Sequence, residues 1–343
     1  MSSSFCYSPN CLLIMLSVIC PVYNEEKYIV SCIESILQQD YPRNEMEVLF
    51  VDGMSTDRTR GIIETYLRKY SFLRVLDNPE KIVPCAMNKG IMESRGEVIV
   101  RIDAHTLYAK NYFSVLVRQL GQLQADNVGA FCRTNVLNKN AKTLAIREVL
   151  SNKLGVGNSV FRTGVDEVME VDTVPFGCWR REVFDKYGYY DTRLVRNQDI
   201  ELNKRIIRGG GKIYIVPDTY CTYLARETFK GVAKNNFQNG EWNILTVYFT
   251  RQFDSLSLRH FVPMMFVASL ILPLLLSVFY LNVIWLAVFS LCLYLCLLLI
   301  ISFRLALKKR LSIFFLLCSF CVLHVSYGCG SIVGVWKVLF GRR

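Results

Sequence analysis

The last quarter of this 343-residue sequence contains no acidic residue, because the final Asp or Glu is Asp254. The whole chain carries 40 Lys and Arg against 29 Asp and Glu, a formal net charge of +11. Eight of the basic residues follow Asp254, which leaves 32 basic against 29 acidic residues before it. The excess positive charge therefore belongs mainly to the tail, and we expect no nucleic-acid partner.

The sequence also lacks low-complexity segments, a collagen-like repeat and a secretory signal. No Lys or Arg precedes the short apolar run at 12–20, so that run predicts a first β-strand. The Ser-rich stretch before it has no periodicity, which makes Met15 a candidate start of the mature chain. The thirteen cysteines are scattered or lie in apolar segments, which suits a reduced cytosolic domain.

Two long uncharged runs fill the tail, 41 residues at 263–303 and 26 residues at 311–336. A helix needs about 20 apolar residues to cross a bilayer. The runs predict helices at 263–281, 283–303 and 312–334, with Asn282 at a turn. A buried core hairpin is the alternative, but soluble cores of this length without a charge are rare. We therefore expect a soluble domain at 1–250 and a membrane anchor at 251–343.

The basic residues of the tail predict its orientation. The positive-inside rule places Arg259 and the cluster at 304–310 on the cytoplasmic side. We expect a multi-pass protein of the inner cell membrane with its soluble domain in the cytoplasm. Three crossings would place Lys337, Arg342 and Arg343 outside, against the rule. Either the glycine-rich last segment is re-entrant or interfacial, or these final charges are too few to matter.

Strand-like and helix-like patterns alternate along the first part of the chain. The strand-like runs are short and apolar, and lie at 12–20, 46–52, 74–77, 97–102 and 128–134. Helical three-and-four spacing of apolar residues separates them. This alternation predicts an α/β fold with a mostly parallel central sheet and helices on both faces. Ligands of such sheets bind at the carboxyl ends of the strands.

Polar residues follow three of these predicted strands. The chain reads PVYNEE at 21–26, DGMSTD at 52–57 and DAH at 103–105. Each segment alone would be a weak signal, because Ser, Thr and Asp commonly cap helices or form turns. Together they predict one shared crevice at the edge of the sheet.

The chain resembles glycosyltransferase family 2, the inverting nucleotide-sugar transferases with the GT-A fold. The resemblance covers about residues 15–250 and looks closest to membrane-anchored exopolysaccharide transferases of the succinoglycan type. It is carried by PVYNEE at 21–26, VDG at 51–53, NKGI at 88–91, RIDAH at 101–105, VDTVPFG at 171–177, RREVF at 180–184 and RNQDIEL at 196–202.

The resemblance implies a site for a nucleotide-sugar donor, with UDP as the expected nucleotide. Tyr23, Asn24 and Glu25 look like the cradle of the base and ribose, with Pro21 fixing the backbone. Asp52 is expected to accept a hydrogen bond from the uracil ring.

Asn88 and Arg95 are further candidates for this donor pocket, with a position on the helix surface as an equal alternative. Arg101 is a candidate pyrophosphate partner, although the sequence leaves the direction of its side chain open.

A divalent cation, Mn²⁺ or Mg²⁺, is the expected cofactor. The family usually has Asp-x-Asp where this chain has Asp103 and His105, and an imidazole suits Mn²⁺ better than Mg²⁺. Asp103 is also expected to contact the ribose. The alternative for His105 is a purely hydrogen-bonding role in the site.

Asp199 is the expected catalytic base, because an inverting displacement needs one group to remove the proton of the acceptor hydroxyl. The alternative is that Asp199 and Glu201 are only first-turn acids, favoured by the helix dipole. A segment near Trp242 is similar to the Gln-x-x-Arg-Trp signature of processive synthases, but Glu241 replaces its Arg. Processivity is therefore unsupported. Residues 230–249 are expected to form a helix at the membrane surface, or an ordinary amphipathic connector.

These features predict a metal-dependent transferase that adds a sugar to a polyprenyl-linked saccharide acceptor during exopolysaccharide, capsule or O-antigen assembly. The membrane is the expected second partner, since the tail would hold the site near a lipid-linked substrate. A polyprenyl-phosphate glycosyltransferase and an inactive membrane scaffold subunit are the alternatives. The joint presence of Asp52, Asp103, His105 and Asp199 argues against the scaffold.

Overall fold

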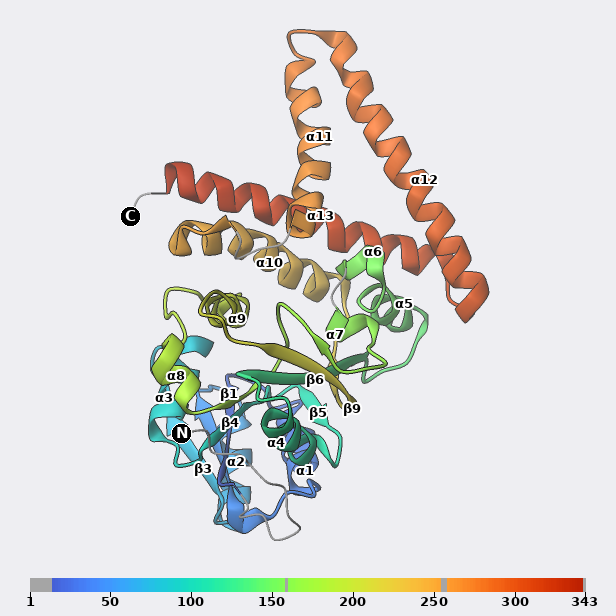
Figure 1. Cartoon of the computed structure of the whole chain (residues 1–343). Coiled ribbons are helices and arrows are strands. Elements are labelled where there is room, and N and C mark those ends of the chain that lie inside the picture. Colours follow the sequence, from blue (N-terminus) through green and yellow to red (C-terminus); the bar gives the residue numbers. More distant parts are fainter. Residues whose placement is uncertain (1–13, 158–159, 254–257, 342–343) are drawn as a thin grey trace. The chain divides into compact units, whose positions relative to one another are not determined.

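A computed structural model of the chain describes residues 14–157, 160–253 and 258–341 (Figure 1). Residues 12–13 of the first expected strand, together with Arg342 and Arg343, lie outside these ranges. The chain forms two compact units. The first comprises Met1–Arg133 and Gly164–Tyr223, and the second Thr134–Thr163 and Leu224–Arg343.

Parallel strands form one half of the sheet in the first unit. They are β1 (Leu16–Val22), β2 (Met46–Asp52), β3 (Leu73–Asp77) and β4 (Val98–Arg101), in the order β3-β2-β1-β4. Val22 pairs with Asp52, and Asp52 pairs with Asp77, so these carboxyl ends meet at one edge of the sheet. Every residue of β2 is buried, which explains its largely apolar sequence.

Helices connect these strands, as the sequence predicts. They are α1 (Ile29–Leu37), α2 (Thr59–Leu67) and α3 (Val83–Glu93). The apolar positions of α1 at three and four spacing, Ile29, Cys32, Ile33 and Ile36, are its buried face. Gly90 allows α3 to pack closely on β1, because a Cβ atom there would lie 2.5 Å from Cγ2 of Ile19.

The other half of the sheet is largely antiparallel, so the sheet as a whole is mixed. Beyond β4 the order continues β8 (Cys178–Arg180), β6 (Asn127–Asn135), β9 (Ile213–Leu224) and β5 (Thr106–Tyr108), and β7 (Met169–Glu170) pairs with β9. The β4–β8, β8–β6, β5–β9 and β7–β9 pairs are antiparallel. The remaining helices of this unit are α4 (Tyr112–Gln122), α8 (Glu182–Tyr187) and α9 (Gln198–Arg208).

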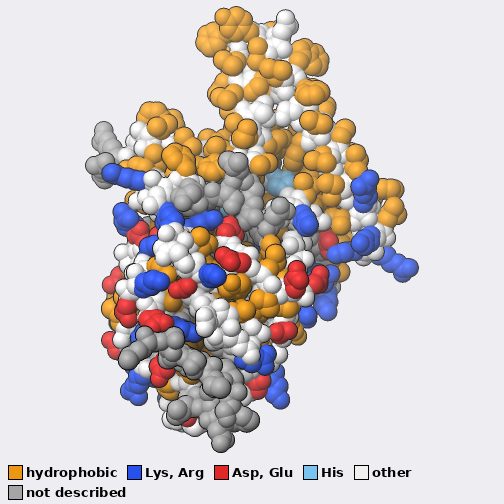
Figure 2. Space-filling view, viewed as in Figure 1, with side chains coloured by type: hydrophobic (Ala, Val, Ile, Leu, Met, Phe, Trp, Pro, Cys, Tyr) orange, Lys and Arg blue, Asp and Glu red, His pale blue; other side chains and the backbone are white. Residues whose placement is uncertain are grey.

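The second unit is helical. Its elements are α5 (Ala141–Val149), α6 (Lys153–Val156), α7 (Val160–Thr163), α10 (Phe229–Thr250), α11 (Val262–Leu276), α12 (Ile284–Lys309) and α13 (Ile313–Phe340). Its apolar core joins Val149 of α5 to Leu298 of α12 and to Leu316 and Phe320 of α13. In Figure 1, α11 and α12 form a hairpin, and Figure 2 shows apolar side chains covering its surface.

Two helical segments of the described residues are long and apolar enough to cross a membrane, Leu281–Lys309 and Ile313–Phe340. The third apolar helix, α11, has only 15 residues and ends at Leu276, earlier than the 281 expected from the sequence. Ser277 is the C-cap of this helix, and its hydroxyl donates to the Leu274 carbonyl at 2.7 Å. The division at residue 250 and the number of crossings stay predictions.

Candidate functional site

A pocket lies at the carboxyl ends of the parallel strands. Five residues that the sequence analysis assigns to the site line it, namely Pro21, Tyr23, Glu25, Asp103 and His105. They come from the end of β1 and from the segment that follows β4. The pocket also includes Val51 of β2 and residues that follow β3, so the ends of all four parallel strands contribute to it.

An imidazole and two carboxylates face this pocket. His105 Nδ1 lies 3.2 Å from Glu25 Oε1. The ring also packs edge-on against Tyr28 and Tyr223, with centroids 6.4 and 5.3 Å away. No group of three His, Cys, Asp or Glu residues in the described part of the chain is placed to hold a metal ion by itself. A cation at Asp103 and His105 would therefore need further oxygen ligands, as substrate phosphates often supply.

The guanidinium of Arg101 lies buried beside Asp103, with 7% of its side chain exposed. Its Nε and Nη2 atoms both donate to Oδ1 of Asp103 at 3.2 Å. The buried Nη1 atom has no hydrogen-bond partner among the described residues. Buried polar groups normally have a partner, so this N–H is suited to a polar ligand. The structure thus settles the side-chain direction that the sequence leaves open: Arg101 points inward.

The charges of Asp103 and Asp199 both affect the pKa of Arg101. Burial alone would lower the pKa of Arg101, but the negative charge of Asp103, followed by Tyr190 and Asp199, raises that pKa overall. Burial also raises the pKa of the Tyr190 hydroxyl, against the opposing effect of Arg101. Asp103 is in direct contact with this guanidinium, and the charge of Asp199 also contributes to the raised pKa of Arg101.

Asp199 stands in the first turn of α9. It is half-buried, and its Oδ1 atom accepts a hydrogen bond from the Ile200 amide at 2.9 Å. Asn197, just before the helix, has a left-handed backbone with φ of 60°. Non-glycine residues seldom adopt this conformation, and it is frequent at functional sites.

Asn24 and Asp52 are engaged in holding the loops after β1 and β2. Asn24 Oδ1 accepts from the Thr56 amide at 2.8 Å, and the Asn24 amide donates to Ser55 Oγ at 3.0 Å. Asp52 Oδ1 accepts from Ser55 Oγ at 2.6 Å, while its Oδ2 lies 3.5 Å from the Arg60 guanidinium. Each carboxylate oxygen has more than one acceptor site, so the predicted contact between Asp52 and the base is compatible with these bonds.

Lys81 is a pocket residue that the sequence analysis misses. Together with Asn78 it follows β3, and both line the pocket. The Lys81 ammonium lies 5.9 Å from the centre of the Tyr23 ring, and its backbone is left-handed with φ of 61°. Inspection of the third strand end, in addition to the first, second and fourth, would have found it.

Asn88 and Arg95 do not line the pocket. Asn88 Nδ2 donates to the Tyr190 carbonyl, and Asn88 Oδ1 accepts from the Tyr190 amide, both at 2.9 Å. Asn88 thus fixes the backbone of Tyr190, whose side chain affects the pKa of Arg101. Arg95 is exposed and precedes β4, at the opposite edge of the sheet from the carboxyl ends. Its position favours the helix-surface alternative.

Sequence comparison places these residues in a known family. Residues 17–188 match the domain described as glycosyl transferase family 2. The dolichyl N-acetyl-alpha-D-glucosaminyl phosphate 3-beta-D-2,3-diacetamido-2,3-dideoxy-beta-D-glucuronosyltransferase of Methanococcus voltae is 26% identical over 66% of this chain and 71% of its own length. The succinoglycan biosynthesis protein ExoA of Rhizobium meliloti is 30% identical over 61% of this chain and 63% of its own.

Solved structures show the same GT-A fold. The mannosyltransferase PcManGT from Pyrobaculum calidifontis, in complex with GDP-Man and Mn²⁺, has a TM-score of 0.60 at 17% identity, over 98% of this chain and 91% of that one. Residues 1–349 of S. aureus TarS, in complex with UDP-GlcNAc, have a TM-score of 0.52 at 17% identity, over 94% and 92%. The predicted fold class is thereby confirmed.

Removal of the Arg101 guanidinium should destabilise the first unit. Arg101→Met leaves buried carboxylates without their cation, a loss of about 3 kcal/mol for a buried pair. We expect a melting temperature lower by about 6 °C or more in thermal unfolding of the purified chain. Arg118→Met, at an exposed position of α4, is the matched control and should melt like wild type. Adding Asp103→Asn to Arg101→Met should recover part of the loss, and a wild-type melting temperature for Arg101→Met alone would contradict this account.

Proposed function

Because the chain belongs to glycosyltransferase family 2, we propose that it is an inverting, metal-dependent transferase that moves a sugar from UDP to a lipid-linked saccharide. The reaction would serve the assembly of exopolysaccharide, capsule or O-antigen. One observation carries the proposal: Tyr23, Glu25, Asp103 and His105 line one pocket at the carboxyl ends of the parallel strands. This pocket offers a stacking face for a base and two ligands for a cation at one place, as transfer from a nucleotide diphosphate sugar requires.

The donor side fits a nucleotide diphosphate sugar. Tyr23 is partly exposed in the pocket and offers a face on which a base can stack. The Lys81 ammonium, in the same pocket, suits the negative charge of a diphosphate.

Asp103 and His105 fit a divalent cation. A carboxylate oxygen and an imidazole nitrogen are ligands that Mn²⁺ accepts, and the diphosphate would supply the remaining oxygens. Such an ion, when bound, neutralises the charge that develops on the leaving diphosphate. Arg101 would orient the Asp103 carboxylate through its two hydrogen bonds, and Glu25 would orient the His105 ring.

The acceptor side requires a base and a lipid-accessible location. In this proposal Asp199 takes the proton of the acceptor hydroxyl as the sugar is attacked, and the half-buried carboxylate is open enough to receive that hydroxyl. The name of the Methanococcus relative specifies a dolichyl phosphate-linked acceptor, and ExoA is named for succinoglycan biosynthesis. Together with the apolar helices, these names support a polyprenyl-linked acceptor at the cytoplasmic face of the inner membrane.

Asp199→Asn should abolish the chemistry while leaving donor binding intact. Loss of a general base costs about 10²- to 10⁴-fold in rate, so kcat should fall by that factor with the UDP-sugar KM unchanged. Asp185→Asn is the matched control, because Asp185 is also a first-turn acid but lies exposed in α8. The measurement is kcat from initial rates of transfer by the two variants. A wild-type kcat in Asp199→Asn would mean that Asp199 is only a first-turn helix acid.

Replacement of His105 should change the metal requirement. His105→Ala should weaken Mn²⁺ binding about tenfold or more, whereas His105→Asp should keep transfer and move the preference towards Mg²⁺. Binding is followed by the electron paramagnetic resonance signal of free Mn²⁺ in the presence of UDP, and transfer by metal titration. Full metal-dependent activity of His105→Ala would refute ligation and leave the imidazole a hydrogen-bonding role with Glu25.

The acceptor class can be decided in one assay. Purified full chain is given radiolabelled UDP-sugars with either a sugar-primed polyprenyl diphosphate or plain polyprenyl phosphate. We expect label in the primed lipid only, because the base on the acceptor side serves a sugar hydroxyl. Label on plain polyprenyl phosphate would instead support the polyprenyl-phosphate glycosyltransferase alternative. The scaffold alternative would be supported if the chain neither transferred nor hydrolysed any nucleotide sugar.

A further inference from the structure

Helix α13 differs from α12 in how much of it is covered. Both are long and apolar enough to cross a membrane. In α13, 39% of the most apolar 18-residue stretch is buried, whereas in the segment that contains α12 only 11% of the corresponding stretch is buried. A helix that crosses a bilayer by itself shows its apolar side chains to lipid, as α12 does. The larger buried share of α13 therefore raises the question of which element covers it.

Two sets of elements cover it. Leu316 and Phe320 of α13 pack in a core with α5 and α12, and α10 runs parallel to α13. Phe229 stacks near Phe315 with ring centroids 6.4 Å apart, and Ser331 Oγ donates to the Gly240 carbonyl at 3.2 Å. Further along, Lys337 pairs with Glu241. The contacts advance in the same direction on both helices, and Figure 1 shows the two side by side.

Glycines bring the two backbones together. A Cβ atom on Gly330 would collide with the Phe237 carbonyl, and one on Gly240 would collide with the Tyr327 carbonyl. Gly334 lies equally close, because its Cβ atom would sit 2.7 Å from the Glu241 carbonyl oxygen. With so little space between the backbones, α13 and α10 share one environment along most of their length.

That environment cannot be the hydrocarbon core, because α10 is polar. It carries Lys230, Lys234 and Glu241, and several Asn and Gln side chains besides. A single charge at the centre of a bilayer costs about 3 kcal/mol on insertion scales, and α10 has three. If α13 crossed the membrane, α10 would have to cross beside it.

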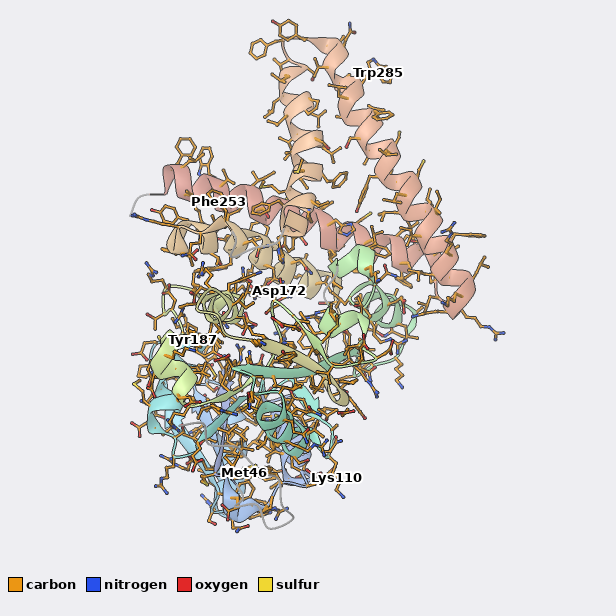
Figure 3. The ribbon with its side chains drawn as sticks, viewed as in Figure 1. Met46, Lys110, Asp172, Tyr187, Phe253 and Trp285 are labelled. Carbon is orange, nitrogen blue, oxygen red and sulfur yellow. The ribbon has the colours of Figure 1, made fainter. Side chains whose placement is uncertain are left out.

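The α11–α12 hairpin has the opposite character. Its two helices are joined by a 2.6 Å hydrogen bond between Ser269 and Ser290. Apolar residues are exposed at its tip: Phe279 of the turn is 81% exposed, and Trp285 in the first turn of α12, labelled in Figure 3, is 67% exposed. In Figure 1 the hairpin points away from α13. The first turn of α11 packs closely against α13, because a Cβ atom on Gly328 would lie 2.3 Å from the Pro263 carbonyl oxygen.

We propose that α10 and α13 lie together in the plane of the membrane surface and that only the α11–α12 hairpin enters the bilayer. The apolar face of α13 that α10 leaves open, with Phe314, Val325, Trp336 and Phe340 exposed, then contacts lipid at the headgroup boundary. The proposal rests on the membrane association of the proposed function, and it chooses the interfacial alternative for the last segment.

The arrangement puts the charges of the tail on one side. Lys309, paired with Glu148 at 2.8 Å, and Lys337, paired with Glu241, both stay with the surface helices. Four residues link β9 to α10, and such a link spans about 14 Å, too little to cross a core of about 30 Å. Lys337 and the end of α13 therefore lie on the same side of the membrane as the link between β9 and α10, and the positive-inside rule is obeyed.

Reporter fusions to the end of the full chain test the proposal. With α13 on the surface, green fluorescent protein fused after the last residue should fluoresce in a bacterial host, and alkaline phosphatase fused there should be inactive. Carbonate washing of the membranes, as a second measurement, should leave the chain in the pellet. An active phosphatase fusion would show that α13 crosses and would overturn the proposal. Release by carbonate would overturn the insertion of the hairpin, irrespective of whether the enzyme transfers sugar.

A matched pair of charge substitutions separates the two environments. Val325→Lys, on the open face of α13, should leave the amount of membrane-bound chain unchanged, because a lysine at the surface reaches water. Leu293→Lys, on the exposed face of α12, should lower that amount several-fold, since it puts a charge into hydrocarbon. Equal loss in both variants would contradict a surface position of α13. Equal tolerance would contradict insertion of α12.

Discussion

The contact between the buried Arg101 guanidinium and the Asp103 carboxylate is the interaction on which the site depends. A buried arginine is costly unless carboxylates compensate its charge, so the end of β4 is stable only with Asp103 beside it. Asp199 and Tyr190 also act on Arg101, which extends the constraint to α9 and to the segment before it. The hydrogen bonds from Asn88 to the Tyr190 backbone then connect α3 to the same place. Elements far apart in the sequence, namely β4, α3 and the segment before α9, thereby meet around Arg101.

Around this centre, the loops are shaped by a few strained residues and by side chains that bind backbone. Asn24, Met54 and Lys81 all have left-handed backbones, and they follow β1, β2 and β3 in turn. Left-handed non-glycine residues cost free energy and persist where the surroundings hold them. Here Asn24 and Asp52 hold the loops through Thr56 and Ser55. These hydrogen bonds hold the loops after β1 and β2 in one conformation, which lowers the entropic cost of binding.

The parallel half of the fold is predictable from the sequence because its strands are short apolar runs separated by helical periodicity. Strand ends in a parallel sheet meet at one edge, so the sequence alone is enough to group Tyr23, Glu25, Asp103 and His105. The antiparallel half is less accessible. β5, β7 and β8 have only two or three residues each, too few to produce a pattern, and β9 contains Pro217, which usually argues against a strand.

The features of the site that the sequence leaves open have equally physical reasons. Arg95 follows a helix closely, and sequence spacing cannot tell which edge of the sheet such a loop occupies. Lys81 escapes the sequence analysis because only the ends of the first, second and fourth strands are considered there, although the polar segment DNPEK at 77–81 follows β3 in the same way. Whether α13 crosses the membrane depends, in our proposal, on its packing against α10, a helix far away in the sequence. Hydropathy of one segment cannot reveal that the partner of this segment is polar.

The central claim is that one site at these strand ends holds the nucleotide and the metal together. It is tested most directly by anomalous diffraction from crystals of the full chain grown with UDP and Mn²⁺. The account predicts a manganese peak within coordinating distance of Asp103 and His105, with the diphosphate bound to the ion and the uracil beside Tyr23 and Asp52. A manganese ion or a nucleotide bound away from Asp103 would contradict it.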